Sequence, residues 1–223
     1  MRVPSRGSGS PSLDLAALAR RGVRPARALA ARGTGGDTPR WHLDEVTGRL
    51  VELSGAGAGA WLTAAMSLVA GTQRRGEPVA WVTLRGSFFF PPDAARHGVD
   101  LAALPVILAP GAAAAGAAAE RLLRSGAFGL VVLDLVPAGD DLPAPLVPRL
   151  AALAERHGTA VLCLTAKPAA APSLGPLVSL RCEARREGLG PGPVPCRVTA
   201  LRDRRRGRPW THVEAFRGPA GLH

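Results

Sequence analysis

The sequence predicts an α/β fold, with a mostly parallel β-sheet flanked by helices on both faces and antiparallel strands at its C-terminal end. Two observations lead to this prediction. Between residues 49 and 165, short apolar runs of four to six residues alternate with helix-forming segments, a pattern typical of parallel strands buried on both faces. After Lys167, polar and apolar residues alternate between loops rich in Gly, Pro and Arg, as in antiparallel strands at a sheet edge.

Taken in order, the apolar runs and the helix-forming segments give a definite set of elements. The expected strands are residues 50–53, 79–84, 104–108, 130–135 and 160–165, then 177–184, 196–202 and 211–216. The expected helices are residues 61–74, 93–97, 111–125 and 146–157. Pro91 and Pro92 end any strand before them and can begin a helix.

The N-terminal region differs in composition from the rest of the chain. Residues 1–12 are rich in Ser, Gly, Pro and Arg, which predicts disorder, and a short helical arm is expected at 13–32. This arm has an apolar side and a basic side, represented by Leu13, Leu15, Leu18, Arg20 and Arg21. We therefore divide the chain into a leader and arm (1–40), a core domain (41–217) and a tail (218–223). The arm either packs on its own core or docks on another subunit.

Charge and composition limit the function classes. The 28 basic and 17 acidic residues give a net charge of +11, which favours an anionic or acidic partner, including DNA. Lys167 is the only lysine, however, and the excess of Arg, Ala, Gly and Pro is also typical of a GC-rich genome. Charge alone therefore leaves DNA binding open.

Neither the cysteines nor the histidines form a ligand pattern. Cys163, Cys182 and Cys196 lack CxxC spacing and are expected to be reduced thiols, and the scattered histidines predict no metal. No apolar run reaches the ~18 residues of a membrane span, and the N-terminus lacks the apolar stretch of a secretory signal. We expect a cytoplasmic protein.

Residues 49–72 have the outline of a phosphate-binding loop: a strand, a turn containing Gly55, Gly57 and Gly59, and a helix. Such a loop needs a final glycine, a lysine for the β- and γ-phosphates, and a Ser or Thr for magnesium. Here these positions hold Ala60, Trp61 and Leu62, followed by Thr63. We interpret the loop as a degenerate remnant and expect no cofactor.

Asp134 ends an apolar strand, as a Walker B aspartate does, although an aspartate at this position is more often a turn cap. The order of these features along the chain, a glycine-rich loop and then a strand that ends in an aspartate, resembles that of RecA, and the resemblance covers about residues 45–217. The matching segments are GRLVELSG (48–55), AARHGVDLAAL (94–104), LLRSGAFGLVVLD (122–134), LVSLRCEARR (177–186) and CRVTALRDRRRGRPW (196–210). The resemblance implies a RecA-like core.

Several RecA residues needed for ATP turnover have no counterpart. Trp61 stands at the lysine and Leu62 at the threonine. The acidic residue that activates water falls near Arg85, and the nucleotide-sensing glutamine falls near Thr165 and Ala166. The resemblance therefore implies that ATP hydrolysis has been lost.

The degenerate loop, together with the segment LRGSFFFPP (84–92), resembles the ImuA family, which is also related to SulA. That resemblance implies an accessory protein of SOS-induced, error-prone translesion synthesis, without catalytic residues of its own. Its implied partners are ImuB, an inactive Y-family polymerase homologue, and RecA. A DnaE-type polymerase would be an indirect partner.

Two surfaces are candidates for partner binding. The first is the N-terminal arm. The second is a basic segment near the C-terminus, which could contact DNA phosphates or an acidic partner, or could be a solvated hairpin turn. Its residues are Arg202, Arg204, Arg205, Arg206, Arg208 and Trp210. The sequence does not decide whether Phe88, Phe89 and Phe90 are core or docking residues, although three adjacent phenylalanines favour at least partial burial.

Two alternative functions remain open. One is a SulA-like inhibitor of cell division, which would bind the tubulin-like division protein. The other is a divergent ATPase that would use Thr63 and Asp134 to hold a metal.

Overall fold

A computed structural model describes residues 39–56, 59–139, 141–188 and 193–217. The predicted disordered leader, the arm with Leu13, Leu15, Leu18, Arg20 and Arg21, the tail and Gly57 lie outside the described residues.

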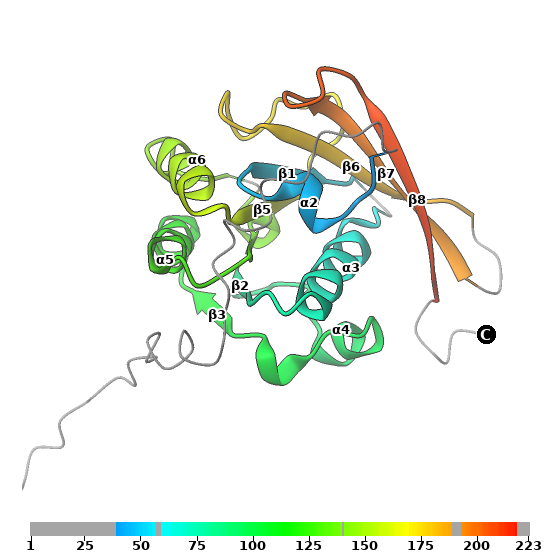
Figure 1. The fold of residues 1–223 in the computed structure, drawn as a ribbon, viewed down its shortest axis with the longest axis horizontal. Coiled ribbons are helices and arrows are strands. Elements are labelled where there is room, and N and C mark those ends of the chain that lie inside the picture. The colour runs from blue at the N-terminus through cyan, green and yellow to red at the C-terminus, as the bar shows by residue number, and fades with distance from the viewer. Residues whose placement is uncertain (1–38, 57–58, 140, 189–192, 218–223) are drawn as a thin grey trace, which may run out of the picture.

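The described chain is built on one eight-stranded sheet, with the strand order β3-β2-β4-β5-β1-β6-β7-β8 (Figure 1). Neighbouring strands from β3 to β6 are parallel, whereas β7 and β8 are added in antiparallel pairings. The strands are β1 (Leu50–Ser54), β2 (Val79–Leu84), β3 (Val106–Ala109), β4 (Leu130–Asp134), β5 (Ala160–Thr165), β6 (Leu180–Arg186), β7 (Pro193–Asp203) and β8 (Trp210–Arg217). The predicted α/β class, with a mostly parallel sheet and antiparallel C-terminal strands, is confirmed.

Helices cover both faces of the parallel part of the sheet (Figure 1). On one face lie α2 (Leu43–Val46), α3 (Trp61–Arg74) and α4 (Pro91–Arg96); on the other lie α5 (Ala112–Ser125) and α6 (Leu146–His157). Because the central strands are buried on both faces, their sequences are continuously apolar rather than alternating.

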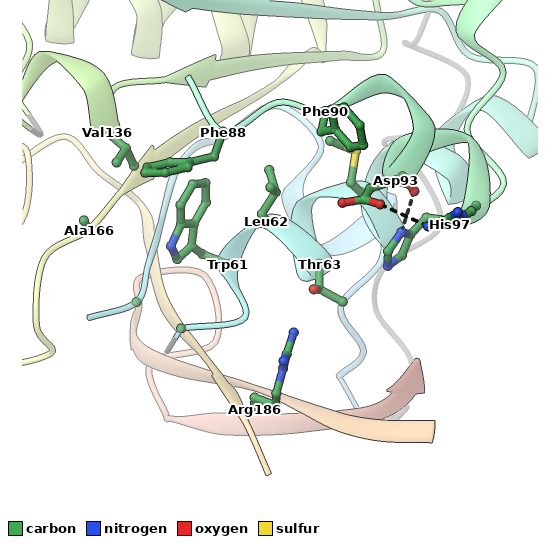
Figure 2. Close-up of a pocket in the computed structure, with 14 residues that line it drawn as sticks. Trp61, Leu62, Thr63, Phe88, Phe90, Asp93, His97, Val136, Ala166 and Arg186 are labelled. Carbon is green, nitrogen blue, oxygen red and sulfur yellow. Dashed lines mark hydrogen bonds and ion pairs between the residues drawn. The ribbon is translucent and has the colours of Figure 1, made fainter. Parts of the chain in front are cut away.

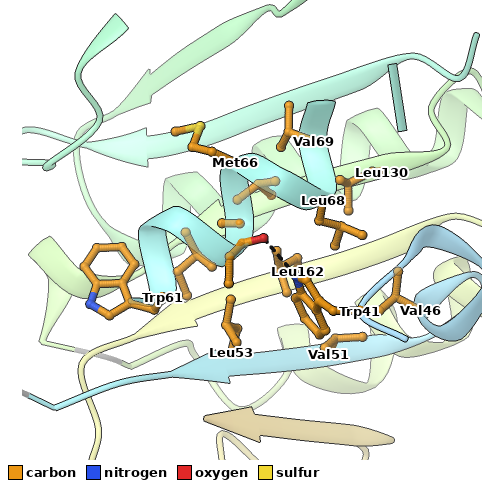
Figure 3. Close-up of a cluster of buried hydrophobic side chains, with 14 of the residues drawn as sticks. Trp41, Val46, Val51, Leu53, Trp61, Met66, Leu68, Val69, Leu130 and Leu162 are labelled. Atoms are coloured by element: carbon orange, nitrogen blue, oxygen red, sulfur yellow. Dashed lines mark hydrogen bonds between the residues drawn. The ribbon is translucent and has the colours of Figure 1, made fainter. Parts of the chain in front are cut away.

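Helix α3 forms the centre of the first face and fixes the position of the loop that precedes it. Figure 3 shows its apolar side chains packed over Leu53 and Leu162 of the sheet. Trp41 lies beside them, and its Nε1 donates a buried hydrogen bond of 2.8 Å to the carbonyl of Ala64. This bond ties the segment before β1 to α3.

Several predicted boundaries match the structure and others move by a few residues. Helix α4 begins at Pro91 rather than at residue 93, because proline fits the first helical positions, where no amide hydrogen is needed. Strand β3 begins at Val106 rather than at 104, since a short 3₁₀ turn (Leu101–Ala103) and the buried Leu104 come first. Helices α5 and α6 are followed by Gly126 and Gly158, which adopt the left-handed conformation that glycine adopts readily.

Candidate functional site

The glycine-rich loop leaves the carboxyl end of β1 and is held tightly against β6. The amide of Ala60 donates to the carbonyl of Ala184 over 3.2 Å, and Gly59 forms an isolated antiparallel bridge with Arg185. A Cβ atom at Gly55 would lie 2.9 Å from the Ala184 carbonyl oxygen, which is too close for a side chain. Glycine is therefore required at Gly55 for the backbone contact between the loop and β6.

Trp61, the first residue of α3, occupies the position where a phosphate-binding loop has its lysine. Its side chain lies against the loop: Cβ atoms built at Gly55 or Gly59 would each be 3.0 Å from its Cδ1. Its ring also meets the ring of Phe88 edge-on, with 6.4 Å between ring centres. Trp61 is only 8% exposed, so this position supplies a packed aromatic ring instead of a mobile cation.

A cavity of about 440 Å³ opens beside Trp61 at the carboxyl edge of the sheet (Figure 2). Its large apolar side chains are Trp61, Leu62, Met66, Phe88, Phe90 and Val136. Its charged side chains are Asp93, Arg96 and Arg186. Thr63, His97, Ala166, Gly55 and Gly59 complete the lining. The site is therefore an apolar cavity with a charged margin.

Asp134 lies at the end of β4 and is fully buried, but it does not line this cavity. Its carboxylate accepts hydrogen bonds from Thr83 Oγ1 at 2.9 Å and from Ser87 Oγ at 2.7 Å, and the amide of Val136 donates to it at 3.3 Å. Ser87 Oγ in turn accepts a hydrogen bond from the amide of Phe89 at 3.0 Å. Asp134 thus fixes the loop after β2, which carries the three phenylalanines.

The three adjacent phenylalanines have different environments. Phe89 is half-buried and packs on Trp81, with 5.0 Å between ring centres. Phe88 and Phe90 are 65% and 55% exposed and line the cavity. The segment is therefore both partly buried and partly available on the surface.

The other positions singled out from the sequence lie at separate places. Thr63 and Ala166 line the cavity, while Arg85 is exposed. Thr165 is buried and donates to Glu52 over 3.3 Å.

Sequence reasoning missed the buried polar cluster around Glu52. This carboxylate accepts the amide of Leu174 at 2.9 Å and lies 3.9 Å from Lys167 Nζ and 4.0 Å from Arg181 Nε. The available signals were a single acidic residue inside an otherwise apolar strand and the only lysine of the chain. The cluster fastens the segment after β5 to the middle of the sheet.

The C-terminal basic segment is organised around Asp203. Its carboxylate accepts a hydrogen bond of 2.6 Å from Arg49, whose side chain is 3% exposed, and one of 2.8 Å from Trp210 Nε1. Burial by itself raises the pKa of Asp203, but the hydrogen bonds from Arg49 and Trp210 outweigh it and lower that pKa. Trp210 is buried in the core, so the surface of this segment consists of its arginines.

Those arginines divide into two groups. Arg206 pairs with Glu45, Arg205 donates to the carbonyls of Asp44 and Thr47, and Arg202 donates to the carbonyl of Val178 at 2.9 Å. These three fasten the end of β7 and the turn after it to neighbouring segments. Arg204 and Arg208 are exposed. These two are the arginines of the segment best placed for an anionic partner.

The three cysteines are free and buried. Burial raises the pKa of the Cys196 thiol to about 11, so it is protonated at neutral pH. Over the described ranges, no group of three or more His, Cys, Asp or Glu side chains is arranged to hold a metal ion. In that same part of the chain, no helix is long and apolar enough to cross a membrane.

No protein-family model matches the chain, and no curated protein is significantly similar to it.

Proposed function

We propose that this protein is a non-catalytic, RecA-like accessory protein of SOS-induced error-prone translesion synthesis. It acts in the cytoplasm by binding an ImuB-type protein, RecA, or both, and a DnaE-type polymerase takes part indirectly. The observation that carries the proposal is the packing of Trp61 against Gly55 and Gly59, at the place where nucleotide phosphates would need a cation.

Three local features support the loss of nucleotide turnover. The apolar Leu62 stands where a magnesium-binding hydroxyl is needed. The amide of Ala60, at the end of the turn, donates to Ala184 and is not available to a phosphate. Asp134 accepts hydrogen bonds from Thr83 and Ser87, which orient its carboxylate toward the neighbouring loop.

The order of elements supports the RecA-like interpretation. A glycine-rich loop follows β1, an aspartate ends β4, and β5 separates these two strands in the sheet. Ligands of open α/β sheets bind beyond the carboxyl ends of the strands, which is where both features lie. A core of this shape that does not turn over ATP can occupy a RecA-type subunit interface without following an ATP-driven assembly cycle.

Capture of purified partners tests the proposal. The immobilised full-length protein is mixed separately with RecA, with an ImuB-type protein and with the tubulin-like division protein. We expect capture of RecA or ImuB, equal with and without Mg-ATP. Capture of neither would refute the proposal, and capture of the division protein alone would support the SulA-like alternative.

Direct DNA contact is a separate part of the proposal, assigned to Arg204 and Arg208. Binding of labelled single-stranded DNA should weaken steeply with salt, because each phosphate contact releases counterions. The double variant Arg204→Ser/Arg208→Ser should reduce both the affinity and the salt slope. Affinity that does not change between low and moderate salt would exclude this contact.

A further inference from the structure

We propose that the cavity beside Trp61 is a docking site for an acidic segment of a partner protein, which inserts one aromatic or large aliphatic side chain among Trp61, Leu62 and Phe88. The inference rests on the proposed function, because it takes the occupant to be a protein partner. Beyond the proposed function, the inference names the place where that partner binds and the kinds of partner side chain that are recognised.

The apolar character of the cavity calls for an apolar anchor. Leu62 of α3 and Phe88 and Phe90 of the loop after β2 converge on it (Figure 2), and Met66 of α3 also lines it. Phe88 and Phe90 are both exposed over more than half of their surface, so covering them removes a large apolar area from water. A volume of about 440 Å³ is within the usual range for a binding pocket.

The loop that presents these rings is held in place before any partner arrives. Asp134 accepts a hydrogen bond from Ser87, Ser87 accepts one from the Phe89 amide, and the Phe89 ring packs on Trp81. Phe88 and Phe90 therefore flank a fixed residue. A preorganised surface loses less conformational entropy on binding than a mobile loop does.

The charges at the margin favour an acidic occupant. Arg186 points into the cavity opposite Thr63 (Figure 2), and its guanidinium makes no hydrogen bond or ion pair within the described part of the chain. Asp93, the one carboxylate among the described lining residues, lies 3.6 Å from Arg96. The lining therefore carries two arginines against one carboxylate, and a carboxylate of the partner would complement Arg186.

A phosphate-bearing ligand fits the same cavity poorly. The Trp61 ring lies against the glycines of the turn, and the Ala60 amide is already hydrogen-bonded to β6. An acidic peptide needs neither of these groups, since its apolar anchor contacts the rings and its carboxylate contacts Arg186.

Selection from a random displayed-peptide library, with the full-length protein as bait, tests the proposal. We expect enrichment of peptides that combine Asp or Glu with one Phe, Trp, Leu or Met. Binding of a synthetic peptide with the enriched sequence, measured by fluorescence anisotropy, should be about thirtyfold weaker for Phe88→Ala, as for a central aromatic contact. It should be about tenfold weaker for Arg186→Glu.

Arg121→Glu is the matched control, because Arg121 is also exposed but lies in α5, on the opposite face of the sheet from α3 and the cavity. Its affinity should stay within about twofold of the unsubstituted protein, since rim charges far from a contact contribute little. The proposal would be overturned if the selection enriched no peptide or enriched basic peptides. It would also be overturned if Phe88→Ala and Arg186→Glu bound the peptide as tightly as the unsubstituted protein does.

The two proposals fail in distinguishable ways. If the unsubstituted protein captures RecA or ImuB and both cavity variants do so equally well, the cavity is not the docking site and the proposed function stands. If the unsubstituted protein captures neither partner, the proposed function fails, and the peptide selection still decides what the cavity binds.

Discussion

Replacing Asp134 with Asn tests whether this residue has a structural role or is a magnesium ligand. In the structure, two hydroxyl groups donate to Asp134 Oδ2, from Thr83 at 2.9 Å and from Ser87 at 2.7 Å, and the Val136 amide donates to Oδ1. Asparagine keeps the shape but loses the charge. It also turns an amino group toward one of these donors.

The size of the effect follows from these contacts. Hydrogen bonds to a charged acceptor contribute about 1.5–3 kcal/mol each, against about 0.5–1.5 kcal/mol for neutral pairs. Weakening the two hydroxyl bonds and placing one donor against an amino group should lower the free energy of unfolding by about 2–4 kcal/mol. Urea denaturation followed by tryptophan fluorescence measures this change. Ser87→Ala, which removes one hydrogen bond to the carboxylate, should lose about 1.5–3 kcal/mol, whereas Ser67→Ala, at an exposed hydrogen bond, should lose almost nothing.

A nucleotide site predicts the opposite set of results. Mg-ATP at 100 times its dissociation constant would stabilise the unsubstituted protein by about 2.7 kcal/mol. For a chain of this size, that corresponds to a rise in Tm of about 5–10 °C. We expect no rise. A rise of that size, together with an Asp134→Asn variant as stable as the unsubstituted protein, would refute the structural role and favour the divergent ATPase.

Two further substitutions test the supports of the fold. Asp203→Asn leaves the buried Arg49 guanidinium without its anionic partner and should cost about 3–5 kcal/mol in urea denaturation. Because the folded pKa of Asp203 is lowered, its contribution is complete above its ordinary pKa and is lost as the pH falls through the folded value. The difference in the free energy of unfolding between the unsubstituted protein and the variant should therefore be smaller in acid than at neutral pH. A difference of the same size at both pH values would contradict this assignment. Gly55→Ala should cost about 1–3 kcal/mol through its clash with β6. Gly111→Ala, where nothing lies within 4 Å of the new Cβ, should be nearly neutral, and equal effects would refute the close approach.

The local elements were predictable from the sequence because burial leaves a strong pattern. The predicted limits of α3, β2, α6 and β5 agree with the structure. Each is either a fully apolar run or a segment with helical periodicity that ends at a turn. The boundary of β3 was less well predicted, because this edge strand is partly exposed and its sequence does not distinguish it from the residues before it.

The relations between distant segments could not be predicted in the same way. Asp134 has the sequence context of a metal ligand, and only the pairing of β2 with β4 brings Thr83 close enough to donate to it. Likewise, Arg206 belongs to an arginine-rich segment that resembles a DNA-binding surface, but the turn folds it onto Glu45. Residue type and spacing do not encode such partners, which are more than fifty residues away.

The glycine-rich loop, the aspartate at the end of β4 and the phenylalanine segment form one connected structure rather than three separate motifs. The loop is fixed to β6 through Ala60, which places Trp61 against the glycines and beside Phe88. Asp134 fixes the other side through Ser87. The two hydrogen-bonded supports thus hold an aromatic wall at the sheet edge where a phosphate-binding protein keeps a mobile lysine and an accessible carboxylate. Replacing Trp61 with lysine alone would leave Leu62, the occupied Ala60 amide and the hydrogen-bonded Asp134 unchanged. The difference from a nucleotide site therefore lies in the whole arrangement, and a rigid apolar edge of this kind is suited to binding a protein.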